Sequence, residues 1–137
     1  MNKIDYSVYL VTDRDILQSR DLCEAVEESI LGGVTVVQLR EKYISFEEFV
    51  KLGKKLHKIT QKYNIPLIIN DNVELAKDID ADGVHVGGDD MSVANARKIL
   101  GNNKIIGATA RTYERAVTAV GQGADYLGIG AIFDTST

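Results

Sequence analysis

Short apolar runs rich in β-branched residues alternate with helical patterns six times along the chain. The runs are almost continuously hydrophobic, which is typical of parallel strands that are covered on both faces. They predict strands at residues 8–12, 34–39, 66–70, 83–87, 104–108 and 126–132. The segments between them repeat apolar residues at helical spacing, so the pattern predicts an alternating β/α chain.

Helix boundaries are marked by residues with known capping roles. Ser45 followed by Glu48 forms a capping box, in which each side chain satisfies a backbone amide of the first turn. Gly32 and the glycine after it end the first long helical pattern. Ser92 and Thr112 stand at the N-cap positions of two later helices. On α-helical spacing, His57 falls on the polar side of its helix and is predicted to be solvated.

Residues 81–87 and 124–130 resemble each other and lie two β/α units apart. Repeated β/α units with right-handed crossovers give a parallel sheet, which is either open or closed into a barrel. No linker or low-complexity stretch interrupts residues 1–137, so we expect a single α/β domain.

Each apolar run turns polar at its C-terminal end. The polar residues fall at 12–14, 40–42, 70–71, 87–90, 109–111 and 134–137. Because parallel strands all point the same way, these clusters converge on one rim, where α/β proteins carry their active sites.

The mixture of side chains on this rim favours a phosphorylated ligand. Arg40 and Lys42 suit phosphate oxygens, whereas Asp71 and Asp90 would repel a bare phosphate. A Mg²⁺ bound between the carboxylates and the phosphate would explain why positive and negative side chains occur together, since this ion takes one or two carboxylates together with substrate phosphates. Neutral hydroxyl donors are added by Thr109, Thr135 and Thr137. The alternative is that these residues are ordinary solvated loop charges.

Composition narrows the function classes. The net charge of −4 is spread along the chain, which argues against a nucleic-acid surface. No apolar run approaches the roughly 20 residues of a membrane span, and no secretory signal is visible at the N-terminus. The lone Cys23 cannot form an internal disulfide, which fits the cytoplasm.

His85 lies inside an apolar strand and is predicted to be a core or interlayer residue. No pair of His or Cys residues has the spacing of zinc ligands.

Ordered motifs along nearly the whole chain resemble the thiamine-phosphate synthase family. They are found at residues 33–42, 69–71, 81–87 with Asp90, 106–107, 123–126 and 133–137. The resemblance implies a (β/α)8 TIM barrel that joins a pyrimidine diphosphate to a thiazole phosphate with Mg²⁺. In the reaction that the resemblance implies, diphosphate leaves the pyrimidine methylene, a delocalised carbocation forms, and the thiazole nitrogen attacks it.

The same resemblance assigns roles to the rim residues. Pyrimidine diphosphate binding is implied for Gln38, Leu39, Arg40, Glu41, Lys42 and Asn70, and contact with the thiazole phosphate for Thr135, Ser136 and Thr137. Asp71 and Asp90 would hold Mg²⁺. Arg40, Lys42 and Thr109 would act on the reacting groups, with Thr109 standing where the family usually has Ser. Other departures are Gly88 for a common Gln, Arg111 for a common His, and Asp134 and Ser136 for prolines.

The resemblance implies eight strands, whereas residues 1–137 supply six. We therefore expect a single incomplete barrel domain, truncated from a longer polypeptide, whose two open edges leave a homo-oligomer possible. The alternatives are a thiazole tautomerase paralogue, an inactive barrel fragment, and a receiver-like phosphate-binding module. A receiver needs a Lys at the end of the fifth strand, whereas Lys104 opens that run.

Overall fold

A computed structural model describes residues 3–89 and 91–136. The strands are β1 (Tyr9–Val11), β2 (Val36–Leu39), β3 (Leu67–Asn70), β4 (Gly83–Val86), β5 (Ile105–Ala110) and β6 (Tyr126–Ile129). The helices are α1 (Arg14–Leu17), α2 (Leu22–Leu31), α3 (Phe46–Lys62), α4 (Val73–Asp78), α5 (Val93–Leu100) and α6 (Tyr113–Gly121). The predicted alternation of strands and helices is confirmed.

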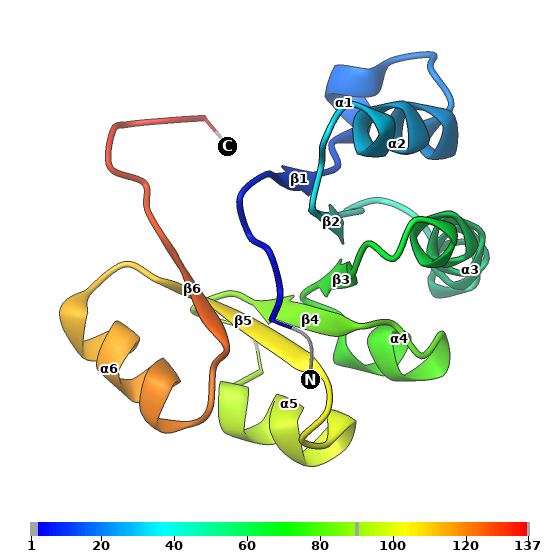
Figure 1. The fold of residues 1–137 in the computed structure, drawn as a ribbon. Coiled ribbons are helices and arrows are strands. Elements are labelled where there is room, and N and C mark those ends of the chain that lie inside the picture. The colour runs from blue at the N-terminus through cyan, green and yellow to red at the C-terminus, as the bar shows by residue number, and fades with distance from the viewer. Residues whose placement is uncertain (1–2, 90, 137) are drawn as a thin grey trace.

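The described strands form one parallel sheet in the order β1-β2-β3-β4-β5-β6. The sheet curls into an open half-barrel, with the long helices on its outer, convex side (Figure 1). The segment before β1 runs along the concave side of the sheet. The carboxyl ends of all the strands consequently meet at one rim of the half-barrel.

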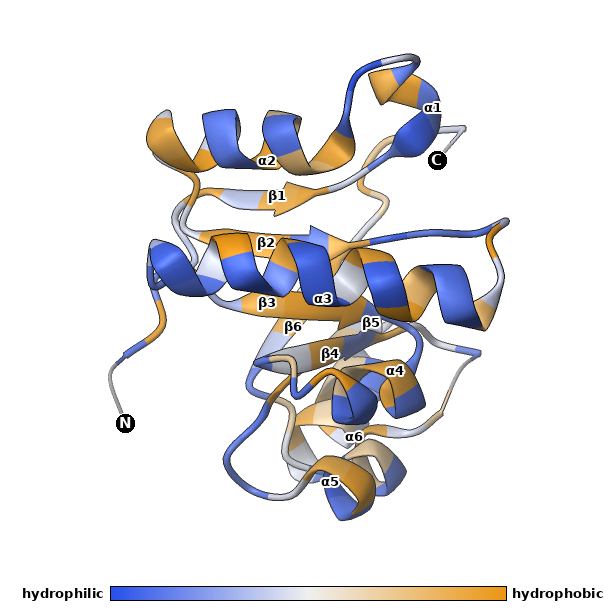
Figure 2. Ribbon diagram, turned by 90° about the vertical axis from the view of Figure 1, so that its right-hand side faces the viewer, coloured by the Kyte–Doolittle hydropathy of each residue, from blue (hydrophilic) through white to orange (hydrophobic). Residues whose placement is uncertain are grey.

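Side chains alternate between the two faces of the sheet. Leu39, Ile69, Val84 and Ile106 point outward and pack with the helices, and each is fully buried. Polar and apolar residues alternate along the helices, as Figure 2 shows for α3, whose buried residues include Phe49 and Leu56. The hydrophobic core therefore lies between the sheet and its helices. The alternate residues of each strand, such as Gln38 and His85, face the concave side.

The predicted helix caps are confirmed. Ser45 and Glu48 form the full capping box of α3. Ser92 accepts a hydrogen bond from the amide of Asn95, and Thr112 accepts one from the amide of Arg115. Cys23 is buried in α2, in agreement with a packing role.

Some details differ from the sequence predictions. β6 ends at Ile129, short of residue 132, because its partner β5 ends at Ala110, the residue paired with Ile129. β5 runs on to Ala110, so Thr109 lies within the strand and not after it. The prediction for His57 is wrong: the residue is 7 % exposed, and its Nδ1 lies 3.3 Å from the carbonyl oxygen of Ile79. The buried stripe of α3 is wide enough to include it.

The internal sequence echo has a structural counterpart. Asp82 stands just before β4, and its Oδ2 accepts a hydrogen bond of 2.8 Å from the amide of Leu67 at the start of β3. Asp125 stands just before β6, and its Oδ2 accepts one of 2.8 Å from the amide of Ile106 in β5. Each aspartate thus fixes the start of one strand against the next, at the end of the sheet opposite the rim.

Candidate functional site

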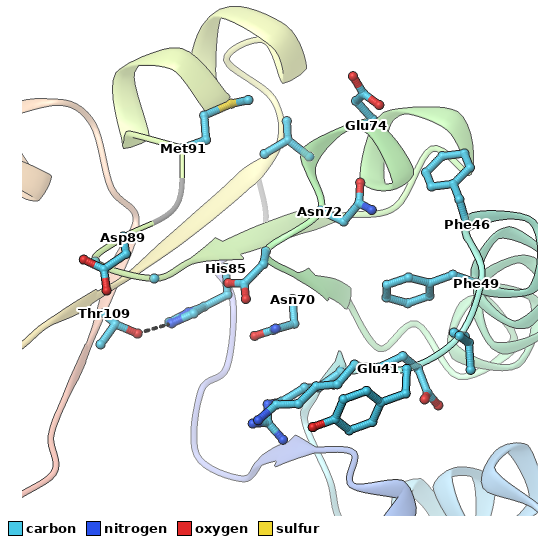
Figure 3. Close-up of a pocket in the computed structure, with 18 of the residues that line it drawn as sticks. Glu41, Phe46, Phe49, Asn70, Asn72, Glu74, His85, Asp89, Met91 and Thr109 are labelled. Carbon is cyan, nitrogen blue, oxygen red and sulfur yellow. Dashed lines mark hydrogen bonds between the residues drawn. The ribbon is translucent and has the colours of Figure 1, made fainter.

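A cleft of about 1340 Å³ lies on the rim, lined by residues near and after the carboxyl ends of β2, β3, β4 and β5. Its wall is polar on the side of the strands, where Asn70, His85 and Thr109 point inward, and apolar near α3, where Phe46 and Phe49 stand (Figure 3). The cleft can therefore hold a ligand with one charged end and one flat apolar end.

Positive side chains surround the polar part of the cleft. Arg40 and Lys42 follow β2, and Arg111 and Arg115 follow β5. The Arg115 guanidinium lies over Gly88, since a Cβ at Gly88 would stand 2.2 Å from its Nη1. Together these side chains can bind an anion with several oxygens, such as a diphosphate.

Two of the residues after β2 already have partners. Arg40 Nη1 lies 4.0 Å from Asp13 Oδ2, and both side chains are about a quarter exposed. Glu41 accepts three hydrogen bonds of 2.7–3.1 Å from Arg14, and its side chain is 3 % exposed. Glu41 raises the pKa of Arg14 through these hydrogen bonds. The carboxylate of Glu41 therefore fixes the loop, and contact with a ligand would come from its backbone.

The acidic side of the cleft contains Asp71 and Asp89. Asp71 has a left-handed backbone with φ of 60° directly after β3, and its amide donates to the carbonyl of His85 at 2.8 Å. Such a conformation is uncommon outside glycine and is often found at functional sites. The second predicted metal ligand, Asp90, lies outside the described residues. Within residues 3–89 and 91–136, no group of three or more His, Cys, Asp or Glu side chains is placed to hold a metal.

The remaining predicted site residues divide between the core and the concave face. The side chain of Leu39 is fully buried under the helices, so only its backbone can face a ligand. Gln38 is 5 % exposed and donates from Nε2 to the hydroxyl of Tyr9 at 2.8 Å. Thr109 lies 2.8 Å from Nε2 of His85, as the dashed line in Figure 3 shows.

The residues after β6 lie further from the main cleft. Ser136 lines a smaller cleft of about 260 Å³ beside Arg40, Lys42 and Asp13. Thr135, which the structure describes, is exposed and lines neither cleft. Thr137 lies outside the described residues.

Sequence reasoning missed the place of His85 and Arg115 in the site. His85 is half-buried and lines the cleft, with its ring bonded to Thr109 and Tyr126. Because His85 lies in an apolar strand, the local sequence did not indicate that its side chain lines the cleft. The available signal was the pair of glycines at 87 and 88 that follows the strand. Arg115 reaches the cleft from the first turn of α6 because Gly88 leaves room for it.

The helices that the structure describes, within residues 3–89 and 91–136, include none long and apolar enough to cross a membrane.

Comparisons with known proteins match the chain to one family. The family model described as thiamine monophosphate synthase matches residues 8–137. A thiamine-phosphate synthase of Clostridium botulinum is 54% identical over 136 residues, which cover 99% of this chain and 64% of that protein. Another of Clostridium acetobutylicum is 54% identical over 137 residues, covering 100% of this chain and 65% of that protein.

A solved structure gives the same result for the fold. The thiamine phosphate pyrophosphorylase from Pyrococcus furiosus matches with a TM-score of 0.84 and 38% identity, covering 92% of this chain and 60% of that one. The chain spans about 64% of the length of the first of these curated relatives. The ordered motifs, the half-barrel and the family match agree, and the chain belongs to the thiamine monophosphate synthase family.

Proposed function

We propose that this chain forms the pyrimidine-diphosphate side of a thiamine-phosphate synthase. The enzyme would join 4-amino-2-methyl-5-hydroxymethylpyrimidine diphosphate to a thiazole phosphate and release diphosphate. The observation that carries the proposal is the rim cleft, in which Arg40, Lys42, Arg111 and Arg115 stand around a polar floor. Membership of the family supports the choice of substrates.

The reaction would begin when the bond between the pyrimidine methylene and the diphosphate oxygen breaks. Its electron pair leaves with the diphosphate, and the positive charge is delocalised over the aminopyrimidine ring. The nitrogen lone pair of the thiazole then forms the new bond to the methylene. The arginines and Lys42 would stabilise the charge that develops on the leaving diphosphate, because preorganised charges act most strongly where charge appears. Apolar walls at Phe46 and Phe49 would help to exclude water from the cation.

The residues present fit a Mg²⁺ site on the diphosphate. This ion keeps several waters and uses one or two carboxylates with substrate phosphates, so it needs no cluster of three protein ligands. We propose Asp71 and Asp90 as its ligands, and of the described residues Asp71 and Asp89 line the cleft. When bound, Mg²⁺ would neutralise part of the diphosphate charge.

We further propose that the half-barrel is the larger part of an eight-stranded barrel, since the chain covers 64% of its relatives. The thiazole phosphate would bind near Thr135, Ser136 and Thr137, where Ser136 approaches Arg40 in the smaller cleft. The single cysteine fits a cytoplasmic enzyme.

Calorimetry with Mg²⁺ tests the proposal. Arg40→Ala should weaken binding of the pyrimidine diphosphate by about ten- to a hundredfold, the range for one hydrogen bond to a charged group. Binding of the unphosphorylated hydroxymethylpyrimidine should change much less. Arg20→Ala is the matched control, since Arg20 is exposed and pairs with Glu28 on α2. Equal losses with both ligands would contradict a diphosphate-binding role for Arg40.

A further inference from the structure

Hydrogen-bonded side chains cross the concave face of the half-barrel without a break. Gln38 Nε2 donates to Tyr9 Oη at 2.8 Å, and the hydroxyls of Tyr9 and Tyr126 bond to each other. The Tyr126 hydroxyl lies 3.0 Å from His85 Nδ1, and His85 Nε2 lies 2.8 Å from Thr109 Oγ1. The chain of bonds therefore joins β2, β1, β6, β4 and β5, and it ends in the cleft.

Strand register explains how Tyr126 reaches His85. His85 pairs with Gly107, and Gly107 pairs with Tyr126, so these residues form one row across β4, β5 and β6. A Cβ at Gly107 would stand 2.0 Å from Cζ of Tyr126. The tyrosine ring therefore occupies the space over the glycine, and its hydroxyl meets the histidine on the next strand.

The amide of Gln38 fixes the direction of the first hydrogen bond in this chain. An amide nitrogen only donates, so Tyr9 accepts from Gln38, and either tyrosine hydroxyl can donate in the bond between Tyr9 and Tyr126. Where Tyr9 donates to Tyr126, the Tyr126 hydroxyl is left to donate to Nδ1 of His85. In a neutral imidazole whose Nδ1 accepts, the single ring proton would lie on Nε2 and be donated to Thr109.

Burial keeps both phenols in the form that can donate. It raises the pKa of Tyr9, and it raises the pKa of Tyr126 far above its ordinary value. Neither phenol therefore ionises near neutral pH. With the ring proton on Nε2, the hydroxyl of Thr109 would accept from His85 and keep its own proton to donate into the cleft.

We propose that Tyr126 is a positioning residue, which holds His85 in the Nε2–H tautomer and thereby makes Thr109 a hydrogen-bond donor to the substrate. The inference about Thr109 rests on the proposed function. Its partner would be an acceptor, either a phosphate oxygen or a nitrogen of the aromatic ring. A ligand group that can only donate is disfavoured at this point of the cleft, because two donors would meet.

Nitrogen-15 NMR of the 137-residue chain tests the tautomer directly. The chain contains two histidines, and the spectrum of His85→Asn identifies the signals that belong to His85. Wild type should show a protonated Nε2 and an unprotonated Nδ1. Tyr126→Phe should give a mixture of tautomers. Tyr6→Phe is the matched control. The centroid of the Tyr6 ring lies 5.1 Å from that of Tyr126, but Tyr6 is not part of this chain of hydrogen bonds, so the variant should leave the tautomer unchanged.

The wild-type spectrum decides the direction of the bonds whether or not the variant folds: a protonated Nδ1 overturns the proposal. An unchanged tautomer in a folded Tyr126→Phe variant overturns the role of Tyr126.

Binding decides the consequence for Thr109. Calorimetry with inorganic diphosphate and with the unphosphorylated hydroxymethylpyrimidine should show a loss of about two- to tenfold in Tyr126→Phe for one of the two probes, as for a single hydrogen bond. The affected probe identifies the acceptor, and a loss with neither overturns the donor role. If wild type binds neither probe, the proposed function fails while the tautomer result stands.

Discussion

Gly107 is the position where a single methyl group should disturb the concave face most. In Gly107→Ala the new Cβ would stand 2.0 Å from Cζ, 2.4 Å from Oη and 2.5 Å from Cε1 of Tyr126. Real carbon atoms do not approach so closely, so the ring must move away. Moving it breaks the hydrogen bonds of Tyr126 with Tyr9 and His85.

The cost follows from these contacts. Forcing a methyl group into a packed region costs about 1–3 kcal/mol, and each lost hydrogen bond costs about 0.5–1.5 kcal/mol. Since moving the ring relieves part of the overpacking, we expect a loss of about 2–4 kcal/mol in the free energy of unfolding. Gly121→Ala is the matched control, since nothing lies within 4 Å of a Cβ there. It should be neutral or stabilise the protein by up to about 1 kcal/mol, the gain of alanine over glycine in a helix.

Urea unfolding followed by circular dichroism measures both variants. The midpoint of Gly107→Ala should fall without a change in slope, because the surface exposed on unfolding stays the same. A Gly107→Ala protein within about 0.5 kcal/mol of wild type would refute the close packing of Tyr126 on β5.

The remaining predictions concern the metal, the base of the sheet and a surface ion pair. Asp71→Asn, in a polypeptide extended to the length of the relatives, should lower turnover at saturating Mg²⁺ by at least ~100-fold, as when an electrostatic element is lost. Asp82→Ala should cost about 1–2 kcal/mol and speed amide exchange at Leu67, which loses its acceptor. Lys104 lowers the pKa of Asp80 below 3.8 through a 2.6 Å hydrogen bond, so this pair stabilises the fold above that pH and the effect is lost on acidification. Lys104→Ala should return the Asp80 pKa, measured by NMR titration, towards its ordinary value.

Asp78, an exposed residue at the end of α4, supplies the matched controls for the two aspartate predictions. Asp78→Asn should leave turnover unchanged, and Asp78→Ala should leave exchange at Leu67 unchanged. Wild-type turnover in Asp71→Asn would remove that residue from the metal site. An Asp80 pKa that does not rise in Lys104→Ala would show that the hydrogen bond is absent in solution.

The places of the strands along the chain and the position of the rim could be predicted from the sequence because both depend on local patterns. A buried parallel strand must be apolar along its length, and its end becomes polar where it meets solvent, as at Asn70. The end of β6 could not be predicted, because residues 130–132 are apolar like the strand itself. What ends the strand is the length of its partner, since Ala110 is the last residue of β5 and pairs with Ile129.

The same limit applies to individual site residues. His57 has a polar side chain, and only the packing of α3 against Ile79 shows that it is buried. Arg115 enters the cleft because of space left at Gly88, which lies far from it in sequence. Contacts of this kind depend on where distant segments meet, so no local pattern contains them.

The aspartates at the base of the sheet have a consequence for how such a protein can be altered. Asp82 and Asp125 fix neighbouring strands at the end away from the cleft, through side-chain bonds to the backbone of Leu67 and Ile106. Alignment of the strands is thus determined at one end of the molecule, and ligand recognition at the other. Loops on the rim can be exchanged or redesigned while the base is left intact, so new chemistry can be introduced on this scaffold without setting strand register again.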